Sequence, residues 1–274
     1  ATLNAAECFD LKDRGAIAPG YRGDVVLLDD LKDFHVNRVF VEGELVAEEG
    51  KYLPEIKKCD IASVKGSVIV KDFSKEKFKM HLKSNKVNVI QILPGGVVTA
   101  KDIAEIELDA NGEFVRNPEV DLVKVAVVER HQGTGNVACG FLKGYGIKEG
   151  AVALSVAHDS HNIIVVGVND DEMEFAVNSL VEQEGGIVLV KEGKVIESMP
   201  MPIAGLMSDQ SGEWVDQKLT DIHEKAYEEL GICGEVEPVM TLCFMSLAVI
   251  PEIKLTDMGL FDVTTFSFIP VEAE

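Results

Sequence analysis

The stretch Ala157-His158-Asp159-Ser160-His161-Asn162-Ile163-Ile164-Val165-Val166-Gly167 places five polar residues between two apolar runs. The runs are residues 151–157 and 163–168, and both have the length and the valine and isoleucine content of buried strands. We therefore predict two buried strands joined by a short polar connection. Gly, Asn and Asp alone suffice for a turn, whereas this connection carries two imidazoles, a carboxylate, a hydroxyl and an amide. Since loops on a rigid scaffold often carry binding and catalytic groups, it is the first candidate site.

Composition indicates a globular protein of one large domain or two ordinary ones. The chain has 274 residues, of which 46% are hydrophobic and 27% charged, enough to build a sizeable core. Its formal net charge of -21 argues against nucleic acid or anionic membrane as partner, because both need a basic surface. No apolar run reaches the roughly 18 residues of a membrane span. No signal peptide is recognisable at the start of the sequence.

The cysteines indicate a reducing compartment. They are odd in number, scattered and never arranged as C-x-x-C, so we predict reduced thiols and a cytoplasmic protein. We expect four of them to be small buried apolar side chains, and Cys139, close to the polar loops, to be the one candidate for reactivity. The five cysteines are Cys8, Cys59, Cys139, Cys233 and Cys243.

The first part of the chain predicts a small β-structure. A helix-like start precedes three short apolar strands, the last two joined by a tight turn at Glu42-Gly43-Glu44. Such a piece is too small to close a core alone. We place a domain boundary at Leu53–Pro54. The predicted elements before it are a helix over 1–9 and strands over 25–28, 36–41 and 45–47.

The remainder predicts a mixed domain with many strands and at least two helices. Asn111-Gly112 marks a hairpin, and Asn169 can cap an amphipathic helix. A second helix spans 213–230, for which Ser208 and Asp209 are candidate caps. We expect a strand over 67–70, a short helix or irregular segment over 73–83, and a frayed end over 269–274. Further strands are predicted over 87–93, 97–99, 123–128, 137–141, 187–190 and 195–199.

A second polar loop follows the strand over 123–128. Arg130 and His131 precede Gly133-Thr134-Gly135, whose backbone amides could face an anion or a ligand edge. The loop lacks the length and the lysine of a P-loop. We predict that it lies beside the loop His158–Asn162, although a plain glycine turn remains an alternative.

Three interpretations of the loop His158–Asn162 stay open. His158, Asp159 and His161 could bind a metal. The loop could instead reach a ligand through hydrogen bonds, or it could be an internally satisfied turn with packed histidines. A hydrolytic triad built on Ser160 is disfavoured, because neighbouring residues rarely supply triad geometry. The isolated histidines His35, His81 and His223 fit surface or core roles better than catalysis.

The first part of the chain resembles the C-terminal end of amidohydrolase-superfamily enzymes. The resemblance rests on Ala1–Glu7, Asp13–Gly20, Gly23–Leu28 and Val39–Gly43. It implies that the first stretch is the last helix of a metal-dependent barrel and that the next ones return into a β-sandwich. Residues 1–53 would then be the last barrel helix and the C-terminal segment of that β-sandwich.

The second half is similar to the C-terminal portion of bacterial adenine deaminases. The motifs keep their order along the chain, and they cover nearly all of it. They are Glu129–His131 with Gly133–Asn136, Ala157–Gly167, Pro202–Ser208 and Leu255–Leu260. The resemblance implies that residues 54–274 are the C-terminal α/β domain of that family. It also implies hydrolysis of adenine to hypoxanthine and ammonia by a metal-bound hydroxide, with manganese, iron or zinc as the metal.

The metal ligands that the resemblance implies are missing from this sequence. No His-x-His pair occurs in it, and the family's metal-binding positions would lie upstream of Ala1. We therefore expect no metal and no catalytic residue in this chain, and no deamination by the chain alone. The expected partners are adenine, the missing barrel portion of the enzyme and further copies in a homo-oligomer. The predicted substrate-binding residues are Arg130, His131, His158, Asp159, Ser160, His161 and Asn162.

Together these observations predict an α+β or α/β fold, with a small β-rich piece followed by a mixed domain. The predicted function is that of the C-terminal part of an adenine deaminase, with this chain lining or covering the active site. The alternative is a non-catalytic purine-binding or assembly module. This alternative is suggested by the isolated β-structure over 1–53, because its unpaired strand edge could pair with another chain.

Overall fold

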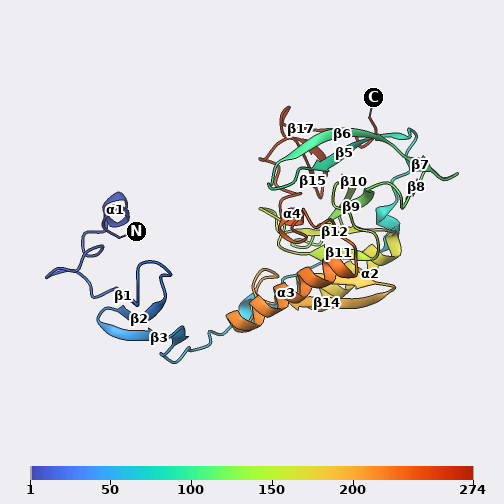
Figure 1. Ribbon diagram of the computed structural model, residues 1–274. Helices are drawn as coiled ribbons and strands as arrows, with labels where there is room; N and C mark the ends of the chain where they lie inside the picture. Colours follow the sequence, from blue (N-terminus) through green and yellow to red (C-terminus); the bar gives the residue numbers. More distant parts are fainter. Residues whose placement is uncertain (1, 274) are drawn as a thin grey trace. The chain divides into compact units, whose positions relative to one another are not determined.

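The structure is a computed structural model that describes residues 2–273. The chain divides into two compact units, Ala1–Asp60 and Ile61–Glu274, each described by itself below (Figure 1). The predicted fold class is confirmed, since the structure is a mixed α/β fold with many strands and few helices. The assignment of residues 1–53 and 54–274 to two family domains stays a prediction.

The first unit is a short helix followed by a four-stranded antiparallel sheet, in which the helix and three strands were predicted and the fourth strand was not. The sheet has the strand order β1-β2-β3-β4. Its elements are α1 (Leu3–Cys8), β1 (Val25–Leu28), β2 (Val36–Val41), β3 (Glu44–Glu48) and β4 (Lys51–Tyr52). Among residues 2–60, Ala6 is the sole buried hydrophobic residue, whereas Phe9, Ile17 and Leu31 are 76%, 90% and 80% exposed. This unit therefore has almost no core of its own.

The second unit is built on an eight-stranded mixed sheet with the order β14-β13-β11-β12-β9-β10-β5-β6. All neighbouring strands run antiparallel except β10 and β5, which are parallel. The strands are β5 (Lys86–Ile92), β6 (Thr99–Glu105), β9 (Leu122–Val128), β10 (Val137–Lys143), β11 (Ala151–Leu154), β12 (Ile163–Gly167), β13 (Gly186–Lys191) and β14 (Lys194–Pro200). Smaller sheets are formed by β7 (Glu107–Leu108) with β8 (Phe114–Val115), and by β15 (Ile253–Thr256), β16 (Gly259–Asp262) and β17 (Ser267–Phe268).

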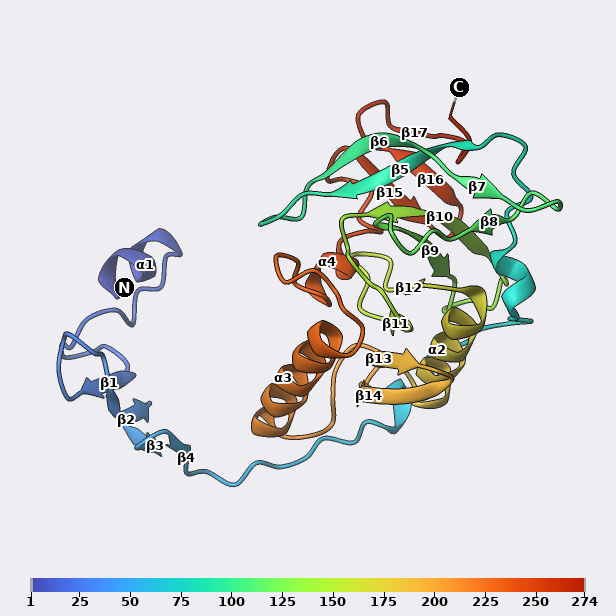
Figure 2. The same cartoon turned by 45° about the vertical axis from the view of Figure 1, so that its right-hand side comes forward.

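The central strands are covered on both faces. Every residue of β9, β11 and β12 is buried, which fits their apolar sequences, and Lys124 is the one charged residue among them. Because side chains alternate across a strand, successive residues enter two different cores. One core packs against α2 (Asp170–Glu182), and the other against α3 (Gly212–Glu228) and α4 (Met240–Cys243). Figure 2 shows α2 and α3 on opposite sides of the sheet.

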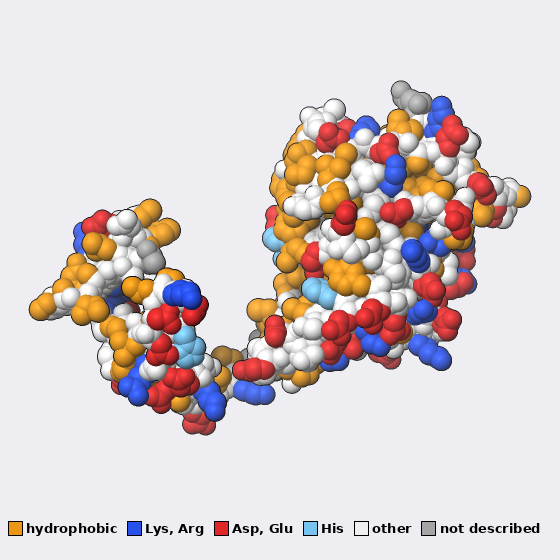
Figure 3. Space-filling view, in the orientation of Figure 1, with side chains coloured by type: hydrophobic (Ala, Val, Ile, Leu, Met, Phe, Trp, Pro, Cys, Tyr) orange, Lys and Arg blue, Asp and Glu red, His pale blue; other side chains and the backbone are white. Residues whose placement is uncertain are grey.

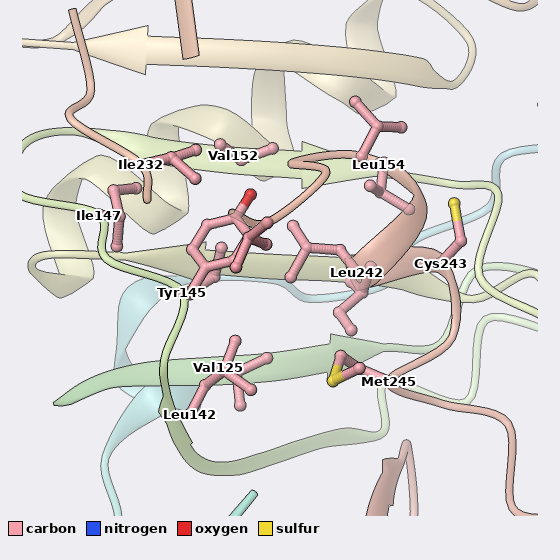
Figure 4. Close-up of a cluster of buried hydrophobic side chains, with 14 of the residues drawn as sticks. Val125, Leu142, Tyr145, Ile147, Val152, Leu154, Ile232, Leu242, Cys243 and Met245 are labelled. Carbon is pink, nitrogen blue, oxygen red and sulfur yellow. The ribbon is translucent and has the colours of Figure 1, made fainter. Parts of the chain in front are cut away.

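The core on the α3 side is the larger of the two. Side chains of the central strands gather around Tyr145 and Leu242 (Figure 4). The Tyr145 hydroxyl is buried and donates to the carbonyl of Pro238 at 2.7 Å, so its polar atom is satisfied inside the core. Helix α4 was not predicted from the sequence, because four residues are too few to show a helical period.

Both long helices begin at a capping side chain. Asn169 accepts a hydrogen bond from the Glu172 amide and caps α2, as predicted. The cap of α3 is Ser211, whose hydroxyl accepts from the Trp214 amide. The proposed caps Ser208 and Asp209 were wrong, since a capping oxygen must lie within reach of the second or third helical amide.

Two further expectations are corrected, and one is refined. Residues 67–70 form no strand, although the Ile69 amide donates to the Arg130 carbonyl. The segment 269–273 is not frayed, because Asn88 donates to Val271 and Ala273 donates to Lys86. The segment 73–83, expected to be a short helix or irregular, contains the short 3-10 helix η2 (Lys75–Phe78) and is otherwise irregular; the 3-10 helix η1 (Ala62–Val64) precedes it.

The cysteines differ from the expectation of four buried side chains. Cys8 and Cys59 are exposed, whereas Cys243 is buried. Burial raises the pKa of Cys139 to about 12, so it stays a thiol and is a poor nucleophile at neutral pH. All five cysteines are free. Within residues 2–273, no helix combines the length and the apolar character needed to cross a membrane.

Candidate functional site

Several loops meet at one end of the eight-stranded sheet. Strand β9 ends at Val128, which pairs with the first residue of both β12 and β10. At the same end β11 finishes and β13 begins, because Leu154 pairs with Ile187. The loops that leave these strand ends are therefore neighbours, although they are far apart in the sequence. We call residues 129–136, 155–162, 200–208 and 256–259 the loop cluster.

The buried guanidinium of Arg130 connects three segments of the loop cluster. The residue is 1% exposed, and its Nε donates to the carbonyl of His161. Its Nη2 lies 3.2 Å from the Ala204 carbonyl and 3.5 Å from the Ser155 carbonyl. Burial lowers the pKa of Arg130. Gly205 leaves room for this side chain, since a Cβ there would lie 2.8 Å from Nη1.

Glu129 shapes the first loop and was not singled out from the sequence. Its carboxylate accepts from the amides of His131, Gln132 and Thr134 and from the Thr134 hydroxyl. Burial on its own would raise the pKa of Glu129, but these hydrogen bonds outweigh it and lower the pKa to about 2. The Thr134 amide, which the sequence suggested could face an anion or a ligand, donates instead to the carboxylate of Glu129. A signal for this role was the position of Glu129 directly after a buried strand.

His131 joins the two loops that were predicted to lie side by side. Its Nε2 lies 2.8 Å from the Ser160 carbonyl oxygen, and the ring is exposed. Because a carbonyl only accepts, Nε2 carries the proton in this contact. In the neutral ring, Nδ1 is then free to accept a hydrogen bond.

His158 lies on the rim of the loop cluster against Phe244. Its amide donates to the Cys243 carbonyl at 2.7 Å. Its ring stacks on Phe244 with the centroids 4.9 Å apart and the planes 23° from parallel. Nδ1 lies 2.7 Å from Oδ1 of Asp159, and the two side chains are 48% and 78% exposed. Phe244 follows the unpredicted helix α4, so no sequence pattern connected it to this loop.

His161 and Asn162 lie deeper in the loop cluster. Burial and the charge of Arg130 lower the pKa of His161. Asn162 is 4% exposed, and its Nδ2 donates to Oδ1 of Asp257 at 3.2 Å. The other oxygen of Asp257 accepts from Asn136 at 3.4 Å. Asp257, in the turn between β15 and β16, therefore links two of the loops.

The loop does not have the features of a metal site or of a hydrolytic triad. Among residues 2–273, no group of three or more His, Cys, Asp or Glu is placed to hold a metal ion. The imidazole centroids of His158 and His161 are 6.3 Å apart. The hydroxyl of Ser160 lies 3.4 Å from the Asn162 amide. The three isolated histidines each face a carboxylate: His35 faces Asp29, His81 faces Glu113, and His223 faces Glu237.

Comparison with known proteins identifies two family matches. Residues 1–46 match the model of the amidohydrolase family. Residues 96–267 match the model of the adenine deaminase C-terminal domain, which covers more than half of the chain. The chain therefore belongs to the adenine deaminase C-terminal domain family. Both resemblances stated from the sequence motifs are confirmed.

The chain is similar to several proteins named adenine deaminase. It is 65% identical over 273 residues to adenine deaminase 2 of Desulfotalea psychrophila. The aligned region covers 100% of this chain and 47% of the relative. It is 48% identical over 274 residues to adenine deaminase of Ligilactobacillus salivarius, with the same two coverages. It is 41% identical over 275 residues to adenine deaminase of Bacillus pumilus, covering 99% of this chain and 47% of the relative. The chain spans about half the length of these relatives and corresponds to their C-terminal half.

Proposed function

We propose that this chain is the C-terminal part of an adenine deaminase, which hydrolyses adenine to hypoxanthine and ammonia, and that its loop cluster lines or covers the active site. The observation that carries the proposal is the convergence of the motif loops at one end of the sheet. The side chains of His131, His158, Asp159 and Ser160 are exposed there and offer both donors and acceptors. A few polar groups of this kind are what orients a purine in a largely apolar site.

The buried residues of the loop cluster would affect substrate binding indirectly, by holding the exposed residues in position. Arg130 holds the carbonyls of His161 and Ala204 in place, and Asn162 anchors the loop to Asp257. A direct contact of Arg130, His161 or Asn162 with substrate stays a prediction. In the proposed enzyme, they keep the exposed side chains at fixed positions when substrate is bound.

The metal of the proposed enzyme does not fit the residues of this chain. The described residues offer no group of three or more suitable side chains. We therefore propose that a divalent metal (manganese, iron or zinc) is bound by the barrel portion and supplies the activated water there. The proposed role of the enzyme is adenine catabolism and purine salvage in the cytoplasm. The free cysteines support that compartment.

The first unit supports the proposal that a barrel portion is the partner of this chain. This unit carries many exposed apolar side chains, among them Val26 and Tyr52 in its sheet and Phe34 just before β2, at 55%, 61% and 60% exposure. Figure 3 shows hydrophobic side chains spread over the surface of this unit. A sheet with so little core needs a covering layer. Strands and helices of the remaining half of an amidohydrolase would supply it, and a homo-oligomer could bury further surface.

A non-catalytic purine-binding or assembly module is the second candidate. The exposed sheet of the first unit favours it as well, because association with any partner would cover the same apolar surface. This candidate would need no metal and no barrel in the same polypeptide.

An assay of adenine turnover separates the two candidates. The full-length gene product that contains these residues and the isolated chain 1–274 would be purified and supplied with Mn²⁺, Fe²⁺ or Zn²⁺. We expect the full-length protein to release ammonia from adenine and the isolated chain to release none. Adenine binding without turnover by the full-length protein would favour the binding module. Metal-dependent turnover by the isolated chain would contradict the location that we propose for the metal.

A further inference from the structure

His158 presents an aromatic ring that is fixed from three sides. Its amide is held by the Cys243 carbonyl, its Nδ1 by the Asp159 carboxylate, and one ring face by Phe244. The side chain nevertheless remains 48% exposed. A half-exposed imidazole normally keeps its rotamer freedom, and ordering it costs free energy. In this protein the contacts to Cys243, Asp159 and Phe244 already restrict the ring of His158. The ring is therefore preorganised, and a ligand does not have to order it on binding.

Phe244 has a rigid support of its own. It directly follows α4, in which Leu242 and Cys243 are buried in the large core. Its amide donates to Thr241, and Phe244 itself packs against that core as a partly buried residue. The stacked pair is therefore attached to the core of the second unit. The ring of His161 is tilted by 41° to that of His158, with its centroid 6.3 Å away, so these two imidazoles do not stack.

We propose that His158 is a stacking platform for the adenine ring in the complete enzyme, and that Phe244 is the positioning residue behind it. This inference rests on the proposed function and adds to it the mode of substrate recognition. A planar purine has a π-face that an aromatic side chain can cover, and such stacking needs no particular hydrogen-bond pattern. In this role His158 contacts the substrate with its ring face and does not transfer a proton.

The test compares substitutions of His158 in the full-length protein. His158→Ala removes the ring, His158→Phe keeps a ring without nitrogen atoms, and His158→Gln keeps polar atoms without a ring. Removing a stacked aromatic side chain should raise KM for adenine by about five- to tenfold with kcat almost unchanged. His158→Phe should restore KM to within about threefold and keep the wild-type pH profile. His81→Ala is the matched control, because His81 is an exposed histidine that faces Glu113.

A second pair of variants tests the support. Phe244→Leu should raise KM by about two- to fivefold, and Phe244→Tyr should retain the wild-type value, because only the second keeps a stacking ring. An unchanged KM in His158→Ala would overturn the inference. So would a His158→Phe variant as impaired as His158→Ala, or a large loss of kcat with an altered pH profile, since these indicate hydrogen bonding or proton transfer.

The inference and the proposed function can fail separately. If the wild-type full-length protein binds adenine without turnover, the deaminase proposal fails, and the same variants are compared by Kd from calorimetry. A weaker Kd in His158→Ala that His158→Phe restores would still support stacking. If the wild-type protein neither binds nor deaminates adenine, both proposals are overturned.

Discussion

Arg130 is buried and donates its Nε to the carbonyl of His161, a residue 31 positions further along the chain. This contact joins the loop after β9 to the loop between β11 and β12. The guanidinium is surrounded mainly by carbonyl oxygens, among them that of Ala204. A rigid fork of donors suits several carbonyls at once, and a lysine could not replace it.

Substitution of Arg130 should destabilise the second unit. Arg130→Met leaves the carbonyls of His161 and Ala204 without a donor, and unsatisfied buried groups cost about 1–3 kcal/mol each. We expect a loss of about 2–4 kcal/mol in the free energy of unfolding, measured by urea denaturation of residues 1–274. Arg14→Met is the control, because Arg14 pairs with its exposed neighbour Asp13 and should change little. Equal stability of the two variants would contradict the role assigned to Arg130.

Gly205 should tolerate no side chain. Its φ is +71°, and a Cβ would lie 2.8 Å from Nη1 of Arg130. Gly205→Ala should lower the free energy of unfolding by about 1–3 kcal/mol, through backbone strain and displacement of the guanidinium. Gly212→Ala, at the first residue of α3 with open space around it, should be neutral or slightly stabilising. Thermal unfolding of both variants checks the difference, and a similar melting temperature for the two would refute it.

Glu129 should contribute stability that depends on pH. Its pKa in the folded protein is about 2, below the ordinary value of 4.5 for a glutamate. A carboxylate with a lowered folded pKa stabilises the fold above its unfolded pKa, and this contribution is lost as the pH falls toward 2. Glu129→Gln should therefore be less stable than wild type at pH 7, by at most about 3 kcal/mol, with the gap closing between about pH 4.5 and pH 2.

Unfolding free energies measured across that pH range test this prediction. The control is Glu105→Gln, which replaces an exposed carboxylate on β6. A gap between wild type and Glu129→Gln that persists unchanged at pH 2 would show that the ionised carboxylate is not what holds the loop 131–134.

Lys124 and Asp170 should behave as a coupled pair. The Lys124 side chain is 7% exposed, its Nζ lies 2.7 Å from Oδ1 of Asp170, and it also donates to the Phe78 carbonyl. Asp170→Asn leaves a buried lysine without its carboxylate, which typically costs about 3–5 kcal/mol. Lys124→Met combined with Asp170→Asn should cost clearly less than the sum of the two single changes. Additive losses in denaturant unfolding would exclude this coupling.

The local elements of the fold could be predicted because their signals are local. Apolar runs, interrupted in β9 only by Lys124, indicated β9, β11 and β12, and Asn169 indicated the start of α2. These local signals do not determine the order of the strands in the sheet. The parallel pairing of β10 with β5 depends on long-range packing that no short motif encodes.

The candidate site was predictable only in part, for the same reason. Polar residues at the ends of buried strands indicated that His131 and the loop 158–162 could be neighbours. The partners that hold them come from distant segments: Asp257 contacts Asn162 across 95 positions, and Phe244 follows a helix of only four residues. Glu129 looked like an ordinary loop carboxylate, since its hydrogen bonds arise only once the loop has folded around it.

Hydrogen–deuterium exchange on the full-length protein tests the central claim most directly. The claim is that the loop cluster faces the substrate of an adenine deaminase. Amide exchange would be measured over residues 131–134 and 158–161, with and without saturating hypoxanthine, the product that is not consumed. We predict slower exchange in both segments when hypoxanthine is bound, and no change over the hairpin 107–115, which is not part of the loop cluster. An active enzyme whose exchange over 131–134 and 158–161 is unaffected by the product would contradict the claim.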